Sequence, residues 1–344
     1  MRSPFWEKAD LPLMTMIKKR KSVEEYKAGI LAGNRAVVAQ AITLVESNLS
    51  ADSDLASALV QEILPYAGNS IRIGITGVPG VGKSTFIEAF GRILLDQGKK
   101  VAVLAVDPSS QKTGGSILGD KTRMEKLAAD RRAFIRPSPS GKTLGGVSSK
   151  TRESMLICEA AGFDVILVET VGVGQSETAV KGMVDFFLLL MLAGAGDELQ
   201  GIKKGIMEMA DGILINKADG DTIPAARRAK NHYQNALHLF PPSESGWYPS
   251  VMIGSSLTGD GLNDCWKKIS EYQNHMVERG FWNENRAMQR LNWLEESIQS
   301  ILGKAFLEHS EIQKRLPEGK EAVKKGILNP IVFAKELTGI FFKR

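Results

Sequence analysis

The sequence is poor in cysteine and has no long apolar segment. Of its 344 residues only Cys158 and Cys265 are cysteines, and they lie far apart. Two distant cysteines do not indicate a disulfide framework, which favours a reducing compartment. The most apolar run, residues 186–193, is too short to span a bilayer, and charged residues interrupt the N-terminal region where a signal core would lie. We therefore expect a cytoplasmic protein with no membrane partner.

The sequence also lacks a strong charge of one sign and has little histidine. The 44 basic and 39 acidic residues are spread along the chain and leave a net charge of +5, so we expect no nucleic-acid partner. The densest basic run, residues 18–21, is more typical of a solvated helix start than of a binding patch. Among the four histidines, only His232 and His238 are close enough to suggest a chelating pair, and a solvated helix face explains their spacing better.

Short apolar runs alternate with amphipathic segments from residue 71 to about residue 256. This alternation predicts an α/β fold with a mostly parallel sheet flanked by helices. Residues 1–70 are expected to form an N-terminal helical extension, residues 71–262 the α/β domain, and residues 263–344 a C-terminal helical region with breaks at Pro317 and Pro330. The predicted strands are Ile71–Thr76, Val101–Val106, Phe134–Arg136, Val165–Glu169, Phe186–Leu192, Ile213–Asn216 and Val251–Gly254.

A glycine-rich loop follows the first predicted strand and precedes a helical segment. That context is the one in which a P-loop binds the phosphates of a nucleotide, so a chance match is improbable. Its glycines bring backbone N–H groups close to phosphate oxygens, and the next helix adds its positive N-terminal dipole. We expect Lys83 to contact the β- and γ-phosphates and Ser84 to ligate Mg²⁺. The loop consists of Gly77, Val78, Pro79, Gly80, Val81, Gly82, Lys83, Ser84 and Thr85.

Two acidic residues at strand ends are candidates for the metal side of this site. Asp107 and Glu169 each close a predicted strand, and the carboxyl ends of parallel strands open onto one crevice. Either carboxylate could instead cap the turn that follows its strand. Glu169 begins the run Glu-Thr-Val-Gly, which matches the second switch of GTPases, usually written with Asp. The Gly172 N–H is then expected to sense the γ-phosphate.

A second motif indicates guanine as the base. Asn216-Lys-Ala-Asp219 follows a predicted strand, and the Asp219 carboxylate can accept hydrogen bonds from N1 and N2 of guanine. Adenine offers neither donor, which would leave a buried carboxylate unpaired. We expect Asn216 to tie this loop to the phosphate loop and Lys217 to lie over the base. The segment Ser255-Ser256-Leu257 is expected to offer backbone N–H groups to O6, so GTP and GDP are the predicted ligands.

The residue after the switch glycine predicts slow hydrolysis. Ras-like GTPases place a glutamine there to orient the attacking water, whereas this chain has Val173, and Gln175 lies two residues further. We therefore expect a partner or a closing loop to raise the rate. Residues 114–123 and 194–205 are the candidate mobile elements, and a merely solvated loop is an equal alternative for each.

Beyond these motifs, the chain resembles the MeaB/ArgK family of GTPases, relatives of the methylmalonic aciduria type A protein. The resemblance covers roughly residues 25–340. It is carried by runs more specific than a P-loop, namely Val106-Asp-Pro-Ser-Ser110, Gly114-Gly-Ser-Ile-Leu-Gly-Asp-Lys-Thr-Arg-Met124, Glu169-Thr-Val-Gly-Val-Gly-Gln-Ser-Glu177 and Gly194-Ala-Gly-Asp-Glu-Leu-Gln-Gly-Ile-Lys-Lys-Gly205.

The resemblance implies a function and several site residues. It implies a homodimer with contacts from the C-terminal helical region, and a chaperone that gates cofactor loading at an adenosylcobalamin-dependent acyl-CoA mutase and protects it. Asp107, Asp120 and Glu169 would serve switch and metal chemistry, and Lys203 would lie in a loop that responds to the mutase. Two alternatives are weaker: a kinase, because no acceptor module is evident, and a nickel-insertion GTPase, because metal ligands are scarce.

Overall fold

A single parallel sheet organises the chain, as the sequence predicted. The computed structural model describes residues 20–106, 124–137, 144–170, 176–193, 204–241 and 243–342. The strand order across the described part is β3-β2-β4-β1-β5-β6-β7, and every neighbouring pair is parallel. The strands are β1 Ile71–Gly77, β2 Val101–Val106, β3 Ala133–Arg136, β4 Val165–Thr170, β5 Phe186–Leu192, β6 Gly212–Asn216 and β7 Ser250–Ile253.

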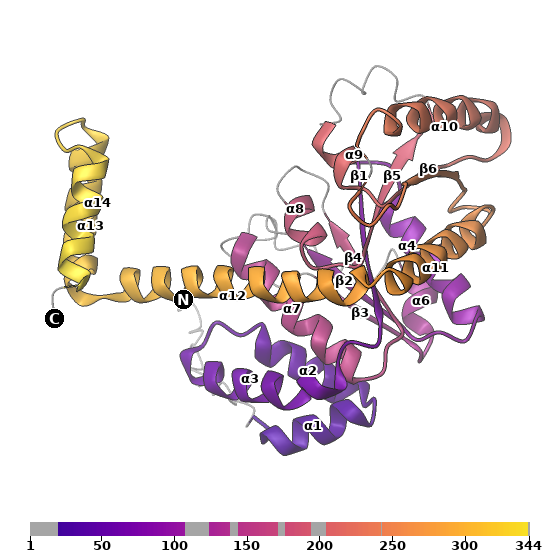
Figure 1. The fold of residues 1–344 in the computed structure, drawn as a ribbon. Coiled ribbons are helices and arrows are strands. Elements are labelled where there is room, and N and C mark those ends of the chain that lie inside the picture. The colour runs from indigo at the N-terminus through magenta and orange to yellow at the C-terminus, as the bar shows by residue number, and fades with distance from the viewer. Residues whose placement is uncertain are drawn as a thin grey trace, which may run out of the picture.

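Helices cover both faces of this sheet (Figure 1). One face carries α4, α6 and α11; the other carries the N-terminal helices with α7 and α8, and α10 at the β6–β7 edge. The helices before the last ones are α1 Val23–Leu31, α2 Arg35–Val45, α3 Ser50–Ile63, η1 Leu64–Tyr66, α4 Lys83–Asp96, α6 Glu125–Ala129, α7 Leu144–Ala160, α8 Ser176–Lys181, α9 Lys204–Met209, η3 Gly220–Thr222, α10 Ile223–Leu237 and α11 Leu262–Glu278.

Strand side chains alternate between the two faces and build two main cores. In β1, Ile73 and Ile75 pack under α4, whereas Gly74 leaves room for the ring of Phe187 from β5 on the opposite face. A Cβ on Gly74 would lie 2.8 Å from that ring, so the close packing of β1 requires glycine. Because both faces are covered, the strands read as continuous apolar runs in the sequence.

The N-terminal helices begin with polar caps that the sequence encodes locally. The Ser22 hydroxyl accepts from the Glu25 N–H at 3.2 Å while the Glu25 carboxylate accepts from the Ser22 N–H at 2.8 Å, a capping box. Asn34 caps α2 through its side-chain oxygen. The buried faces of α1 and α2 then pack on α7, which attaches this extension to the sheet.

The C-terminal helices extend away from the sheet. They are α12 Phe281–Glu308, α13 Ser310–Lys324 and α14 Pro330–Phe342. Figure 1 shows α12 leaving the α/β core and carrying the α13–α14 hairpin at its far end. The hairpin packs closely because Gly319 lacks a Cβ, which would otherwise overlap the Phe333 ring. Among the described helices, none combines the length and apolar composition needed to cross a bilayer.

The prediction that Pro317 breaks a helix is wrong. Pro317 lies inside α13, where it cannot donate to the carbonyl of Gln313, one turn earlier. Gln313 is an exposed residue, so this turn of α13 lies at the surface. The break occurs instead at His309, between α12 and α13. Pro330 behaves as expected, since it begins α14 at a position where the missing N–H costs nothing.

Candidate nucleotide site

The loop between β1 and α4 adopts a conformation that requires glycine. Gly77 has φ +153°, and a Cβ there would lie 2.5 Å from the carbonyl oxygen of Leu190 on β5. Gly82 has φ +93° and immediately precedes α4, so the chain enters the helix through a left-handed residue. Lys83 is the first residue of α4, which directs the positive end of the helix dipole toward the loop.

The Lys83 side chain folds back over the loop. Its Nζ donates to the carbonyl oxygen of Gly77 at 2.9 Å. Burial lowers the pKa of Lys83, and the negative charges of Glu169 and Glu177 partly offset that effect. The ammonium group is therefore held among acceptors at the mouth of the loop, where it can move onto a phosphate oxygen.

The structure brings Ser84 and Glu169 together. The Ser84 Oγ donates to the Glu169 carboxylate at 3.0 Å, which joins the first turn of α4 to the carboxyl end of β4. A hydroxyl and a carboxylate are hard oxygen donors, and Mg²⁺ takes few protein ligands beside water and phosphate oxygens. This donor pair fits Mg²⁺. Among the described residues, no group of three or more His, Cys, Asp or Glu side chains is arranged to hold a metal alone.

Asn216 links three loops at the carboxyl edge of the sheet. Its Nδ2 donates to the Val81 carbonyl oxygen at 2.9 Å, the link to the phosphate loop that the sequence predicted. Its Oδ1 accepts from the Ser256 N–H at 3.1 Å and from the Ser256 hydroxyl at 2.7 Å. The side chain is buried, so these bonds are shielded from competing water.

The side-chain hydroxyls of Ser255 and Thr222 hold Asp219 in place. The Ser255 hydroxyl donates to the Asp219 carboxylate. The Thr222 Oγ1 accepts from the Asp219 N–H at 3.0 Å and lies 2.6 Å from the Lys217 carbonyl oxygen, to which it donates. The carboxylate is thus oriented before any base arrives, which reduces the entropy lost on binding.

Lys217 has the one positive φ among the described non-glycine residues, at +58°. This left-handed turn sends its side chain toward the phosphate loop, where Nζ donates to the carbonyl oxygen of Gly80 at 2.9 Å. The side chain is exposed along the way. Such backbone outliers cost on the order of 1 kcal/mol and cluster at functional sites.

The serine loop is arranged differently from the sequence prediction. The Ser256 N–H is engaged by Asn216, and the Leu257 N–H lies 3.2 Å from the Ser255 Oγ, to which it donates. The Leu257 side chain is 83% exposed. Ser255 and Ser256 therefore orient Asp219 and Asn216, and the N–H groups of Ser255, Ser256 and Leu257 all have protein acceptors in this arrangement.

Several residues at this edge had no role in the sequence prediction. Thr76 and Thr170, at the ends of β1 and β4, share a buried hydrogen bond of 2.9 Å beneath the phosphate loop. Thr222 was missed, although a threonine after Asn-Lys-x-Asp is a recognisable capping residue. Glu177 was noted only within a family run, and its negative charge acts on the pKa of Lys83.

Four predicted residues lie outside the described part of the chain: Asp107, Asp120, Gly172 and Lys203.

These features define the class of protein. A glycine-rich loop that joins a central parallel strand to a helix beginning with lysine is the P-loop of nucleoside triphosphatases. The Asn-Lys-x-Asp loop, bonded to the P-loop through Asn216, is typical of the members that select guanine.

Comparison with known proteins gives the family. Residues 38–311 match the model of the methylmalonyl Co-A mutase-associated GTPase MeaB. The chain is 47% identical to the GTPase ArgK of Escherichia coli, with 89% of this chain and 92% of that protein covered. It is 44% identical to the mitochondrial methylmalonic aciduria type A homolog of Mus musculus, with 91% of this chain and 78% of that protein covered.

A solved structure agrees with this assignment. The crystal structure of an LAO/AO transport system kinase superposes with a TM-score of 0.72 at 39% identity, covering 93% of this chain and 97% of that one. The chain therefore belongs to the MeaB family, and it is a GTPase.

Proposed function

We propose that this GTPase is a chaperone of an adenosylcobalamin-dependent acyl-CoA mutase of the methylmalonyl-CoA mutase type. In this proposal it gates cofactor loading and protects the mutase. The observation that carries it is the match of residues 38–311 to a family described as mutase-associated. The curated mouse relative, named for methylmalonic aciduria, supports the same kind of partner.

The phosphate side of the site would use Mg²⁺ with residues of α4 and β4. Residues 77–85 would bind the phosphates through backbone N–H groups, with Lys83 on the β- and γ-phosphates. The Ser84 hydroxyl and the Glu169 carboxylate, 3.0 Å apart, would hold the ion directly or through water. When bound, Mg²⁺ neutralises developing charge on the phosphates. Asp107 and Asp120 remain candidates for the same side, and Gly172 for sensing the γ-phosphate.

The base side would read guanine through Asp219. Its carboxylate, oriented by Ser255, would accept from N1 and N2 of the base, with Lys217 lying over the ring. Asn216 would hold the base loop against the phosphate loop. Leu257 would close the pocket as an exposed apolar side chain.

Hydrolysis would be slow until a partner completes the site. Val173 cannot orient a water in the way that glutamine does at this position in other GTPases. Residues 194–203 lie outside the described part of the chain, and we propose that the glycine-rich segment 194–205 would be ordered by contact with a mutase surface. Lys203 in that loop would transmit the contact.

The long helix α12 supports a homodimer. Its exposed apolar residues recur at the three-four spacing of a helix seam, and an unpaired seam of this length in water favours association. They are Leu291 at 53% exposed, Leu294 at 56%, Ile298 at 48% and Ile301 at 67%. We propose residues 1–70 as a helical extension, 71–262 as the GTPase domain and 263–344 as the dimerisation region.

The dimer is tested by sedimentation of Ile298→Glu. A charge in the seam should shift the protein from dimer to monomer, whereas Glu295→Gln on the same helix should leave the dimer intact. A parent that sediments as a monomer at micromolar concentration would contradict this part of the proposal.

The chaperone function is tested by co-purification with the cognate mutase. Size-exclusion chromatography of the two proteins should give a complex whose amount differs between GDP and a non-hydrolysable GTP analogue. Loading of adenosylcobalamin into apo-mutase, followed by its absorbance, should then depend on the bound nucleotide. Loading that is the same with and without this protein would contradict the gating role.

A further inference from the structure

The carboxyl end of β4 is bonded by side chains to both ends of the phosphate loop. Glu169, the last residue but one of β4, accepts from the hydroxyl of Ser84 in the first turn of α4 at 3.0 Å. The next residue, Thr170, donates from Oγ1 to Oγ1 of Thr76 at 2.9 Å, immediately before the loop begins. Successive side chains of a strand point to opposite faces, so the two bonds hold β4 from opposite sides of the sheet.

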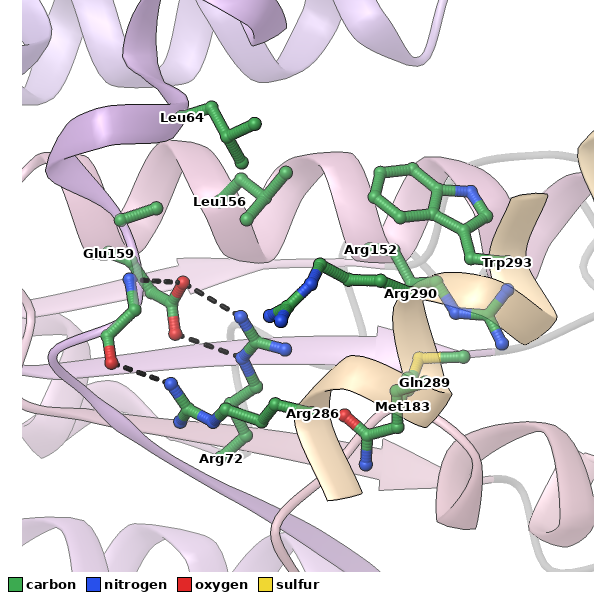
Figure 2. Close-up of a pocket in the computed structure, with 12 residues that line it drawn as sticks. Leu64, Arg72, Arg152, Leu156, Glu159, Met183, Arg286, Gln289, Arg290 and Trp293 are labelled. Atoms are coloured by element: carbon green, nitrogen blue, oxygen red, sulfur yellow. Dashed lines mark hydrogen bonds and ion pairs between the residues drawn. The ribbon is translucent and has the colours of Figure 1, made fainter. Parts of the chain in front are cut away.

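The amino end of β1 is held by a separate set of charged residues beside a cavity of about 340 Å³ (Figure 2). Arg72, the second residue of β1, forms a two-bonded pair with Glu159 of α7 at 2.9 and 2.8 Å. The Arg72 N–H donates to the Asp185 carboxylate at 2.8 Å, and Arg286 of α12 pairs with the same carboxylate. Because β1 is anchored at its start, its carboxyl end is where the phosphate loop can shift relative to β4.

The backbone ladder between β1 and β4 ends one residue before the threonine pair. On the β4 side the pairing of β1 ends with Ile75 opposite Glu169, whereas on the β5 side it continues to Gly77. The bond between the hydroxyls of Thr76 and Thr170 thus extends the contact of β1 with β4 by one residue. It reaches the position that directly precedes the first glycine of the phosphate loop.

The two hydroxyls lie in an otherwise apolar part of the core. Thr76 and Thr170 are each 1% exposed, and Val106 and Val168, which share the face of Thr170, are buried in the core next to α7. When both members of a buried hydrogen-bonded pair are replaced by apolar groups of the same shape, stability changes little. A pair of valines would therefore stabilise the sheet about as well, and what the hydroxyl pair adds is a bond with a fixed direction.

We propose that Thr76 and Thr170 are a positioning pair for the metal side of the GTPase site, an inference that rests on Ser84 and Glu169 as the proposed Mg²⁺ ligands. The bond between the threonines fixes the end of β4 relative to the phosphate loop. It thereby keeps the Glu169 carboxylate beside Ser84, because the partners that surround metal ligands set the position of those ligands and the affinity for the metal. Thr170 is not itself a ligand, because its side chain points to the opposite face from Glu169.

The test is calorimetric titration of the full-length protein with a non-hydrolysable GTP analogue, once with Mg²⁺ and once with EDTA. The ratio of the two affinities measures how much Mg²⁺ tightens binding, and we call this ratio the Mg²⁺ effect. The double variant Thr76→Val/Thr170→Val should fold like the parent, because an apolar pair replaces a hydroxyl pair of the same shape. Its Mg²⁺ effect should fall by about tenfold, while its affinity in EDTA should match that of the parent.

Two single variants complete the comparison. Thr170→Ser keeps the hydroxyl donor and should keep the Mg²⁺ effect of the parent. Thr338→Val on α14 removes an exposed hydroxyl that donates to the Ala334 carbonyl oxygen within its own helix, and it should bind like the parent. The proposal is overturned if the double variant keeps the full Mg²⁺ effect, or if Thr170→Ser loses as much of it as the double variant does.

Ser84→Ala separates this proposal from the metal site on which it rests. If Ser84→Ala keeps the full Mg²⁺ effect, the assignment of the metal ligands is wrong and the positioning role is overturned with it. If Ser84→Ala loses the effect while the double variant keeps it, the metal site stands and only the role of the threonines is overturned. No mutase is present in these titrations, so their outcome is independent of the chaperone function.

Discussion

Asn216 donates from Nδ2 to the carbonyl oxygen of Val81 over 2.9 Å, and both residues are fully buried. One hydrogen bond therefore connects the loop that is expected to bind phosphate with the loop that is expected to bind the base. Since Asn216 also accepts from the Ser256 N–H and hydroxyl, this one amide contacts all three loops.

Asn216→Ala should loosen the whole site. It leaves the Val81 carbonyl and the Ser256 N–H and hydroxyl without their partner, which should lower the free energy of unfolding by about 2 kcal/mol. Affinity for GTP and for GDP should fall together, because the defect lies in the loops that both nucleotides share. Denaturant melts and nucleotide titrations measure the two effects. Asn231→Ala, at an exposed position on α10, is the control.

Asp219→Asn should change the base that the protein prefers. An amide can donate to the C2 carbonyl of xanthine but cannot accept both guanine donors. The loss of two charge-assisted contacts should cost on the order of 3 kcal/mol, about a hundredfold in GTP affinity. Competition between GTP and xanthosine triphosphate measures the preference. Asp221→Asn, two residues along and exposed, should not alter it, and an unchanged preference in Asp219→Asn would remove Asp219 from the base pocket.

Lys83→Ala should abolish tight GTP binding, because it removes the ammonium group that lies 2.9 Å from the Gly77 carbonyl at the loop. Equilibrium titration with a fluorescent GTP analogue checks this. Lys230→Ala, at an exposed position on α10, is the matched control, because it also removes one positive charge and should bind GTP like the parent. If Lys83→Ala bound GTP as tightly as the parent, the assignment of the phosphate site would be wrong.

Glu153 on α7 should make stability depend on pH. Burial raises the pKa of its carboxyl from 4.5 to about 7, and the nearby Lys150 offsets this only in part. The Lys150 ammonium donates instead to the Glu46 carbonyl and to Asn48. Between pH 4.5 and 7 the folded state retains a proton that the unfolded state releases, so the free energy of unfolding falls as pH rises.

Glu153→Gln should remove that dependence. Above pH 7 the variant should be more stable than the parent by on the order of 2 kcal/mol, and near pH 4 the two should be alike. Urea melts from pH 4 to pH 8 measure this. Glu278→Gln, at an exposed position on α11, is the control and should show no such gain. If the free energy of unfolding changed between pH 5 and pH 7 in the same way for the parent and for Glu153→Gln, the raised pKa of Glu153 would be contradicted.

The sequence predicted the sheet well because its strands are buried on both faces. All seven predicted strands are present, and their ends differ by about one residue, as at Gly254, which lies just outside β7. The link from Asn216 to the phosphate loop was also predictable, because the motif requires it. Such local sequence patterns predict strands and motif contacts without knowledge of the three-dimensional packing.

Features that depend on packing between distant segments were not predictable. Pro317 lies inside α13, and no local signal in the sequence marks it as a proline that a helix tolerates. The engagement of the Ser256 N–H by Asn216 depends on how two loops meet. The cavity that Arg72 lines brings together residues as far apart in the sequence as Gly68 and Trp293, and no local motif marks them.

The measurement that tests the central claim most directly is GTP hydrolysis with and without the cognate cobalamin-dependent mutase. Alone, the protein should turn GTP over slowly, because Val173 stands where other GTPases have glutamine. The mutase should accelerate hydrolysis, and Lys203→Ala should blunt that acceleration while leaving GTP affinity and the basal rate nearly unchanged. A Lys203→Ala variant that responds fully would remove Lys203 from the coupling. A mutase that neither binds nor stimulates the protein would contradict the chaperone function itself.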